Sequence, residues 1–328
     1  MKLARRRMLH LAASALALPA LSAPAVAQDF PSRRITVIVP FAAGALNDLV
    51  ARIFAKAMEP SLGQPVIVEN VTGADGSIGQ TRAARATADG YTLLVGSWNT
   101  QVANPLIYKL GYDPAQAFAP VVMLPGSPMA LIAKNSLPDN LAAFIAYLKA
   151  NPGKASLGTA GPGSPPDMLA RLFGKNSDTR FNLVAYRGAA PAMQDVIGGQ
   201  IDATFITVAP ALPHIVANSV KAYGLTSRKR LPQAPSIPTM EEAGLRDFFF
   251  LYWAGLFAPR GTPDPIIKKI NAAVVGALAD PELRRKLEAQ CFEIPSPEQL
   301  TPQALGSFVQ SQDDEWWPII KAAGIKPE

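Results

Sequence analysis

Short, mostly apolar runs alternate with amphipathic stretches along most of the chain. Residues 35–40 read Ile-Thr-Val-Ile-Val-Pro, a run typical of a strand that is covered on both faces. After it, Val50, Ile53, Phe54 and Ala57 follow the i, i+3, i+4, i+7 spacing of a helix with one apolar face. Because this strand-to-helix order repeats, the pattern predicts an α/β fold built on a doubly wound parallel sheet.

The alternation continues towards the C-terminus with one interruption. Near residues 123–128, Met-Leu-Pro-Gly-Ser-Pro, the pattern pauses, and a new cycle begins with the apolar run 129–133. Further strands are predicted at 65–69 and 91–95, before Gly161, and at 181–185, 203–206 and 251–258. Further helices are predicted at 77–86, 141–150 and 167–173, and from Asp264, Pro281 and Pro302 onward.

A strand, a glycine-containing turn and a helix start recur three times, within residues 35–52, 157–172 and 182–197. Each copy directs a helix N-terminus, with its unpaired N–H groups and partial positive charge, at whatever lies beyond the strand end. Such ends bind anions without a charged side chain. An ordinary strand-to-helix turn explains any one copy, whereas three copies indicate a protein that holds a small anion.

Two of these helix starts carry residues suited to capping. Asn47 or Asp48 is expected to cap the first helix. In the second, Ser164 fits the N-cap position, Pro165 fits the first helical position, and Asp167 follows three residues after Ser164 in a capping-box-like arrangement.

The first 27 residues have the features of a secretory signal peptide. Lys2 and residues 5–7, three arginines, make a basic start, residues 8–21 are apolar, and residues 25–27 resemble a small-residue cleavage site. The apolar stretch is too short to span a bilayer. Because Arg5 and Arg6 are adjacent, both the general and the twin-arginine export routes stay open. We therefore predict a periplasmic protein, cleaved after about residue 27.

Composition indicates a globular protein without a nucleic-acid footprint. Hydrophobic residues make up 49% and charged residues 17% of the chain. The 31 Lys and Arg fall to 27 once the four in the signal peptide are removed, against 25 Asp and Glu. The only basic cluster, residues 228–230, is interpreted as a solvated loop.

The sequence does not favour catalysis, a metal site or a cofactor. Cys291 is the only cysteine, so no internal disulfide is possible, and it is expected to be a buried apolar residue. His214 is the only histidine outside the signal peptide, and it is expected at a helix start. Zinc needs several ligands at close spacing, and no Gly-x-Ser-x-Gly elbow is present. The glycines at 73–79 also lack the dinucleotide-binding order.

Several short motifs occur along the chain in the order that one family shows. They are residues 38–44 with 48–52, 68–70, 73–79, 89–94, 151–154, 186–193, 198–202, 211–215, 235–244, 255–259 and 323–325. Together they resemble the Bug family, the extracytoplasmic substrate-binding receptors of tripartite tricarboxylate transporters.

The resemblance implies a type II periplasmic-binding-protein fold, in which two doubly wound lobes close on a ligand through a hinge. Lobe 1 would comprise 28–127 plus 253–328, and lobe 2 would comprise 128–252. It also implies a monomeric receptor that captures a small organic carboxylate and delivers it to a permease with a large and a small membrane subunit. A receptor for a membrane histidine kinase and, less favoured, an enzyme of the same architecture are the alternatives.

The resemblance places the ligand at strand-end loops from both lobes. The expected ligand-binding residues are Phe41, Gly44, Ala45, Leu46, Asn47, Asp48, Ser97, Trp98, Thr159, Ala160, Gly161, Gly163, Ser164, Tyr186, Arg187, Gly188, Ala189, Phe205 and Ile206. The chain departs from the family where 42–45 read Ala-Ala-Gly-Ala in place of prolines and glycines. It departs again at Leu46, usually a small residue, and at Ile206-Thr207, where relatives carry Asp-Asn.

Six large side chains are candidates for the walls of the ligand cleft, with packing inside the core as the alternative. They are Leu46, Trp98, Phe205, Ile206, Tyr252 and Trp253. If several of them line the cleft, a highly charged ligand would be poorly compensated there, whereas apolar surface gains about 25 cal/mol per Å² on burial. This hypothesis favours an aromatic or aliphatic mono- or dicarboxylate over citrate, aspartate or glutamate.

Overall fold

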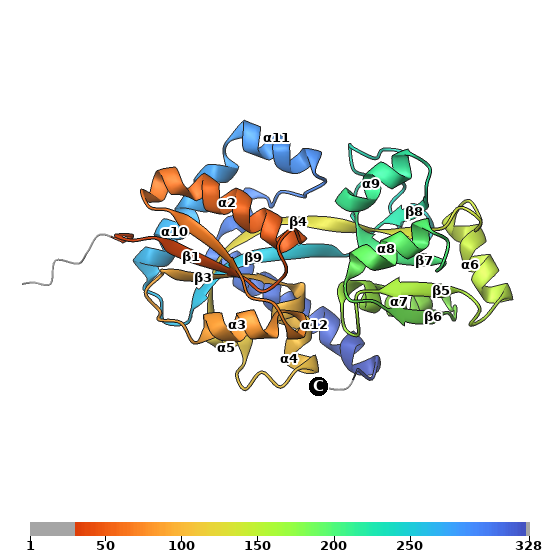
Figure 1. Cartoon of the computed structure of the whole chain (residues 1–328), viewed down its shortest axis with the longest axis horizontal. Coiled ribbons are helices and arrows are strands. Elements are labelled where there is room, and N and C mark those ends of the chain that lie inside the picture. The colour runs from red at the N-terminus through yellow and green to blue at the C-terminus, as the bar shows by residue number, and fades with distance from the viewer. Residues whose placement is uncertain (1–29, 326–328) are drawn as a thin grey trace, which may run out of the picture. The chain divides into compact units, whose positions relative to one another are not determined.

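Two long antiparallel strands, β4 (Phe118–Ala133) and β9 (Leu251–Pro259), lie at the centre of one large sheet (Figure 1). The computed structural model describes residues 30–325, and the fold is that of the compact unit beginning at Arg33. The predicted signal peptide, residues 1–27, lies outside the described residues.

The first half of the sheet joins three parallel strands to β9. β1 (Ile35–Val39) pairs with β2 (Val66–Asn70) and β3 (Thr92–Ser97), and β9 runs antiparallel beside β3. The connecting helices are α2 (Leu46–Leu62) and α3 (Ser77–Ala84). Four of the five β1 residues are buried, which agrees with the run's apolar character.

The second half of the sheet is built from β5 (Ser156–Thr159), β6 (Asn182–Ala185), β7 (Ala203–Thr207) and β8 (Lys221–Leu225). β5 is parallel to β6 and β7, while the far end of β4 runs antiparallel to β7 and β8. Its helices are α6 (Leu141–Ala150), α7 (Pro165–Ser177), α8 (Ala189–Ile197) and α9 (Val208–Val216). Within the described residues the strand order is β2-β1-β3-β9-β4-β7-β5-β6, with β8 also on β4.

Shorter elements and the C-terminal helices complete the unit. They are η1 (Ala74–Gly76), η2 (Asn99–Ala103), α4 (Asn104–Ile107), α5 (Pro114–Ala117), α10 (Asp264–Leu278), α11 (Pro281–Ala289), η3 (Pro297–Leu300) and α12 (Pro302–Ala322). α12 packs against β4, η2 and α7, and so contacts both halves of the sheet. The helix starts expected near Pro281 and Pro302 are confirmed.

Three expectations from the sequence are corrected. The pause expected at residues 123–128 is the middle of β4, which leaves β9 and joins β7 and β8 through a register shift between Leu124 and Ser127. The shift places Pro125 outside the ladder, which spares a pairing that proline cannot make. The sheet is mixed instead of wholly parallel because β9 returns antiparallel. His214 lies in the last turn of α9, because this helix begins directly after β7.

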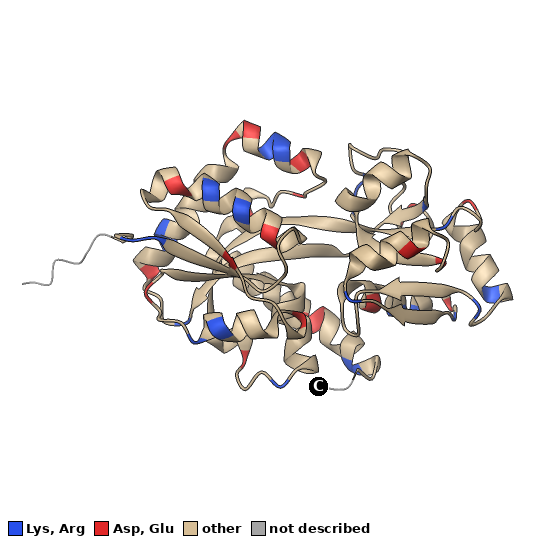
Figure 2. Cartoon of the chain, viewed as in Figure 1, with Lys and Arg blue, Asp and Glu red and all other residues tan. Residues whose placement is uncertain are grey.

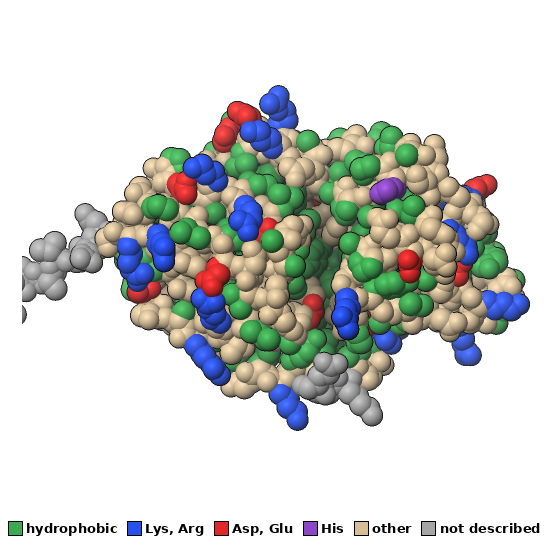
Figure 3. Space-filling view, viewed as in Figure 1, with side chains coloured by type: hydrophobic (Ala, Val, Ile, Leu, Met, Phe, Trp, Pro, Cys, Tyr) green, Lys and Arg blue, Asp and Glu red, His purple; other side chains and the backbone are tan. Residues whose placement is uncertain are grey.

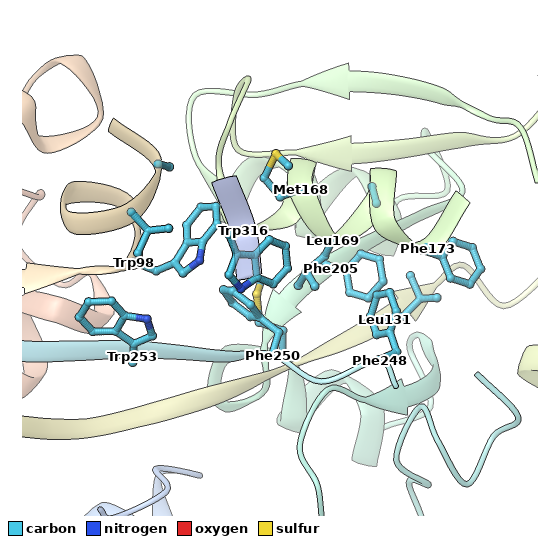
Figure 4. Close-up of a cluster of buried hydrophobic side chains, with 14 of the residues drawn as sticks. Trp98, Leu131, Met168, Leu169, Phe173, Phe205, Phe248, Phe250, Trp253 and Trp316 are labelled. Carbon is cyan, nitrogen blue, oxygen red and sulfur yellow. The ribbon is translucent and has the colours of Figure 1, made fainter. Parts of the chain in front are cut away.

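The core is rich in aromatic side chains (Figure 4). Trp98 and Phe250 each meet the ring of Trp316 edge to face at 5.4 Å. Cys291 is buried in a second apolar cluster, as predicted, and burial raises the pKa of its thiol.

Charged residues are spread over the surface of the unit, with both signs on either half of the sheet (Figure 2). In the basic segment 228–230, the Arg228 guanidinium lies 4.2 Å from the centre of the Phe249 ring, and Arg230 forms an ion pair with Glu242 at 2.7 Å. None of the helices in residues 30–325 has the length and apolarity that a membrane crossing requires.

Candidate ligand-binding site

The loop between β1 and α2 is held by one buried carboxylate. Asp48, which is 3% exposed, accepts the N–H of Gly44 at 2.9 Å and the Nε–H of Arg52 at 3.0 Å, both on Oδ2. Asn70 donates to Asp48 Oδ1 at 2.8 Å and to the Phe41 carbonyl at 3.0 Å. Burial raises the pKa of Asp48, but these hydrogen bonds and the Arg52 charge outweigh it and hold the pKa below its ordinary value.

The loop between β5 and α7 repeats this arrangement atom by atom. Asp167, 2% exposed, accepts the Gly163 N–H at 2.9 Å and the Arg171 Nε–H at 3.1 Å, again both on Oδ2. In each loop the sequence is Gly-x-x-x-Asp-x-x-x-Arg, with a glycine in the left-handed region at φ 83° or 74°. We call these two arrangements the Gly–Asp–Arg brackets.

The expected caps are therefore only partly correct. The N-cap residue of α2 is Ala45, and Asp48 acts from the third helical position on a glycine before the cap. Ser164 occupies the N-cap of α7 as predicted, but its hydroxyl donates to the Gly161 carbonyl at 2.6 Å instead of accepting from the helix. The Gly161 carbonyl lies three residues before Ser164, and this local hydrogen bond takes the place of a bond between the hydroxyl and the N–H groups of the helix.

The third strand-end loop, between β6 and α8, has no such bracket. The Tyr186 hydroxyl donates to Asp195 at 2.6 Å, and this hydrogen bond raises the pKa of Tyr186 to about 12. Gly188 is the N-cap of α8 at φ 115°, and Arg187 beside it is exposed. In Figure 1 the starts of α2 and α8 face each other across the middle of the unit, and Figure 3 shows a groove there.

A buried polar cluster lies at the ends of β1 and β3. Asn47 donates to the Tyr252 hydroxyl at 3.2 Å, and Asn99 donates to Asp75 Oδ2 at 2.7 Å. The Oδ1 atoms of Asn47 and Asn99 are buried without a hydrogen-bond partner, although the two residues are only 2% and 4% exposed. A buried acceptor of this kind costs free energy until water or a ligand donates to it.

Sequence reasoning missed Asp75 and Asn99 as members of this cluster. Asp75 adopts a left-handed conformation with φ 48° and ψ 37°, and burial raises its pKa to about 6. The available signal was an aspartate inside the glycine-rich turn 73–79, which follows a strand end. No sequence pattern marked Asn99 as a site residue, because only the fold brings η2 next to the β2–α3 loop.

The structure gathers sixteen of the expected ligand-binding residues into two groups and packs the other three, Trp98, Phe205 and Ile206, in the core. Phe41, Gly44, Ala45, Leu46, Asn47, Asp48 and Ser97 lie at the ends of β1 and β3 in the first half. Thr159, Ala160, Gly161, Gly163, Ser164, Tyr186, Arg187, Gly188 and Ala189 lie at the ends of β5 and β6 in the second half.

Four of the six expected cleft-wall side chains are packed inside the core. Trp98, Trp253 and Phe205 have no exposed surface, and Ile206 is 2% exposed. Phe205 packs between the rings of Phe173 and Phe248 (Figure 4). Strand alternation directs Phe205, Ile206 and Trp253 into apolar clusters, and Trp98, at the start of η2, joins the same core. The alternative that the sequence left open, packing inside the core, is therefore correct for these four side chains. Leu46 and Tyr252 keep partial exposure.

Gly161→Val is expected to cost about 1–3 kcal/mol of stability and to weaken ligand binding. Gly161 has φ 110°, a conformation that a valine adopts only under strain, while a Cβ there would meet nothing closer than the Tyr186 carbonyl at 3.9 Å. The cost is therefore backbone strain and not a clash. Urea unfolding and calorimetry measure both effects. Gly276→Val, in α10 with open space around it, is the control and is expected to lose neither stability nor affinity.

The structure also contains a cavity away from these loops. It has a volume of about 740 Å³ and lies between residues 226–233 and the helices α11 and α12. Arg228, Lys229 and Arg284 line it together with Glu288, Glu293 and Glu315, so charges of both signs offset one another. Over the described residues, no three His, Cys, Asp or Glu side chains gather as a metal site requires.

The family model for the tripartite tricarboxylate transporter family receptor matches residues 50–325. The chain belongs to this family. The chain is 36% identical to the periplasmic binding protein BugD over 91% of its own length and 100% of that structure, with a TM-score of 0.80. The Bug-family resemblance and the two-lobed α/β fold are thereby confirmed.

Two further solved structures from Rhodopseudomonas palustris carry ligands. MatC with bound malate is 38% identical, covers 89% of this chain and 100% of its own, and has a TM-score of 0.79. A second protein, solved with adipate, is 30% identical, and the match covers 92% of this chain and 100% of that structure with a TM-score of 0.83. Receptor relatives of this chain therefore bind dicarboxylates.

Proposed function

We propose that this protein is a periplasmic receptor that captures a small organic carboxylate and delivers it to a tripartite permease with a large and a small membrane subunit. The observation that carries the proposal is the pair of Gly–Asp–Arg brackets, which hold two helix starts at strand ends on either half of the sheet. Helix starts of this kind bind carboxylates through free N–H groups. The malate and adipate in the two relatives support the same ligand class.

The proposed ligand site lies between a lobe of residues 28–127 plus 253–328 and a lobe of 128–252. The loop 41–48 supplies backbone donors from the first lobe, and the loops 159–164 and 186–189 supply them from the second. Asn47 and Asn99, whose Oδ1 atoms lack partners, would accept from a donor group on the ligand or from a bridging water.

The polar cluster changes the ligand expected from the sequence. The preference for an aromatic or aliphatic acid depended on six wall residues, of which four are core. The unpaired amide oxygens of Asn47 and Asn99 instead favour a ligand that carries a hydroxyl beside its carboxylate. A screen should therefore include malate, adipate, benzoate, citrate and glutamate.

In a thermal-shift screen, at least one of these acids is expected to stabilise the protein. A ligand that binds only the folded state adds about 2.7 kcal/mol at a hundredfold excess over its Kd. Mass spectrometry of the recovered acid is expected to find it unchanged, and conversion would favour an enzyme. A screen in which only phosphorylated sugars or nucleotides stabilise the protein would contradict a carboxylate receptor.

A further inference from the structure

The two brackets place a negative charge where a receptor for anions needs a positive one. Asp48 and Asp167 each lie at the third position of a helix, within the turn that carries the positive end of the helix dipole. That end is equivalent to about half an elementary charge. A lone carboxylate there would more than cancel it, and would repel a carboxylate ligand at the same helix start.

Each bracket contains one cation that removes this conflict. Arg52 and Arg171 donate their Nε–H to the same Oδ2 that accepts the glycine N–H, at 3.0 and 3.1 Å. The aspartates are nearly inaccessible, while the arginine side chains are 52% and 35% exposed. The carboxylate thus fixes the loop, and the guanidinium cancels its charge from the outer side of the helix.

We propose that Arg52 and Arg171 are positioning residues of the ligand site, which keep the two helix starts attractive to an anion without touching it. This inference rests on the proposed carboxylate-binding function. Because it concerns charge, a lysine at either position should retain most of the effect, whereas a neutral glutamine should not. A purely geometric role for the planar guanidinium would make lysine as poor as glutamine.

Ligand binding should depend on the arginine of one bracket more than on the arginine of the other. Asp48 has a second support, since Asn70 donates to its Oδ1 at 2.8 Å. The hydrogen bonds found for Asp167 come from Gly163 and Arg171 alone among the described residues. Loss of Arg171 should therefore affect binding more than loss of Arg52.

The test is titration calorimetry of the full mature chain with malate and adipate. Arg52→Gln and Arg171→Gln are expected to lower the affinity about tenfold, with the larger loss at Arg171, and the Lys variants to stay within about threefold of wild type. Arg82→Gln is the matched control, since Arg82 makes an ion pair with Glu69 at 2.6 Å on a helix without a bracket. It is expected to change the affinity less than about twofold.

Two results would overturn the inference while malate or adipate still binds the wild type. One is a Gln variant that binds as tightly as Arg82→Gln. The other is a Lys variant as weak as the Gln variant, with unchanged urea midpoints. A wild-type protein that binds neither acid overturns the proposed ligand class, a failure that is visible before any variant is made.

Discussion

Replacing Trp316 by alanine is expected to lower the free energy of unfolding by about 3–5 kcal/mol. Trp316 is 1% exposed, and its ring meets the rings of Trp98 and Phe250 edge to face at 5.4 Å each. It therefore joins α12 to the end of β3 and to the segment that enters β9. Removing the indole leaves a cavity between these three elements. They cannot move together to fill it, because other packing contacts hold each of them in place.

Far-UV circular dichroism during urea unfolding measures this loss without relying on tryptophan fluorescence. The matched control is Trp317→Ala in the same helix, since Trp317 is only partly buried and donates its Nε1–H to the Val102 carbonyl at 3.0 Å. It is expected to cost about 1–2 kcal/mol. Equal losses in the two variants would contradict the assignment of Trp316 to the packing centre.

Asp75→Asn is expected to stabilise the protein by about 3 kcal/mol at pH 8 and by much less at pH 4. Burial raises the pKa of Asp75 from 3.8 to about 6, against the hydrogen bond from Asn99. The folded protein thus holds this proton more tightly than the unfolded chain does. Stability from Asp75 is fully present below pH 3.8 and is lost as the pH rises through 6.

The amide removes this titration and also suits the local backbone, because asparagine tolerates the left-handed conformation. Urea unfolding at pH 4 and pH 8 measures the difference. Asp178→Asn is the control: it is also left-handed, with φ 51°, but its side chain is exposed. Asp178→Asn measures the backbone preference alone, and an equal gain for Asp75→Asn at both pH values would mean that this preference is responsible for the whole effect.

Most elements follow from local signals in the sequence. The helix 141–150 is found at its predicted bounds, and the strands before the glycine turns end where the turns begin. These features depend on periodicity and on residues at helix starts, which act over a few positions. The same local spacing placed Gly44 and Gly163 in the loops that lead into α2 and α7.

The roles of individual side chains depended on segments far apart in the chain. Residues 123–128 look like a break, but pairing with residues 251–259 makes them strand. Trp98 directly follows β3 and Phe205 lies in the middle of β7, and rings from α12 and from residues 248–250 cover them. Burial raises the pKa of Asp75, although Asn99 of η2, 24 residues later in the chain, donates a hydrogen bond that lowers it.

The sequence by itself thus determined the order of strands and helices, the glycine turns and the family of this protein. Only the tertiary structure decided which aromatic side chains are core, which amide oxygens lack partners, and that Arg52 and Arg171 compensate buried aspartates. The physical reason is that periodicity reports a residue's face within its own element, whereas burial and charge compensation depend on what other elements bring to that face.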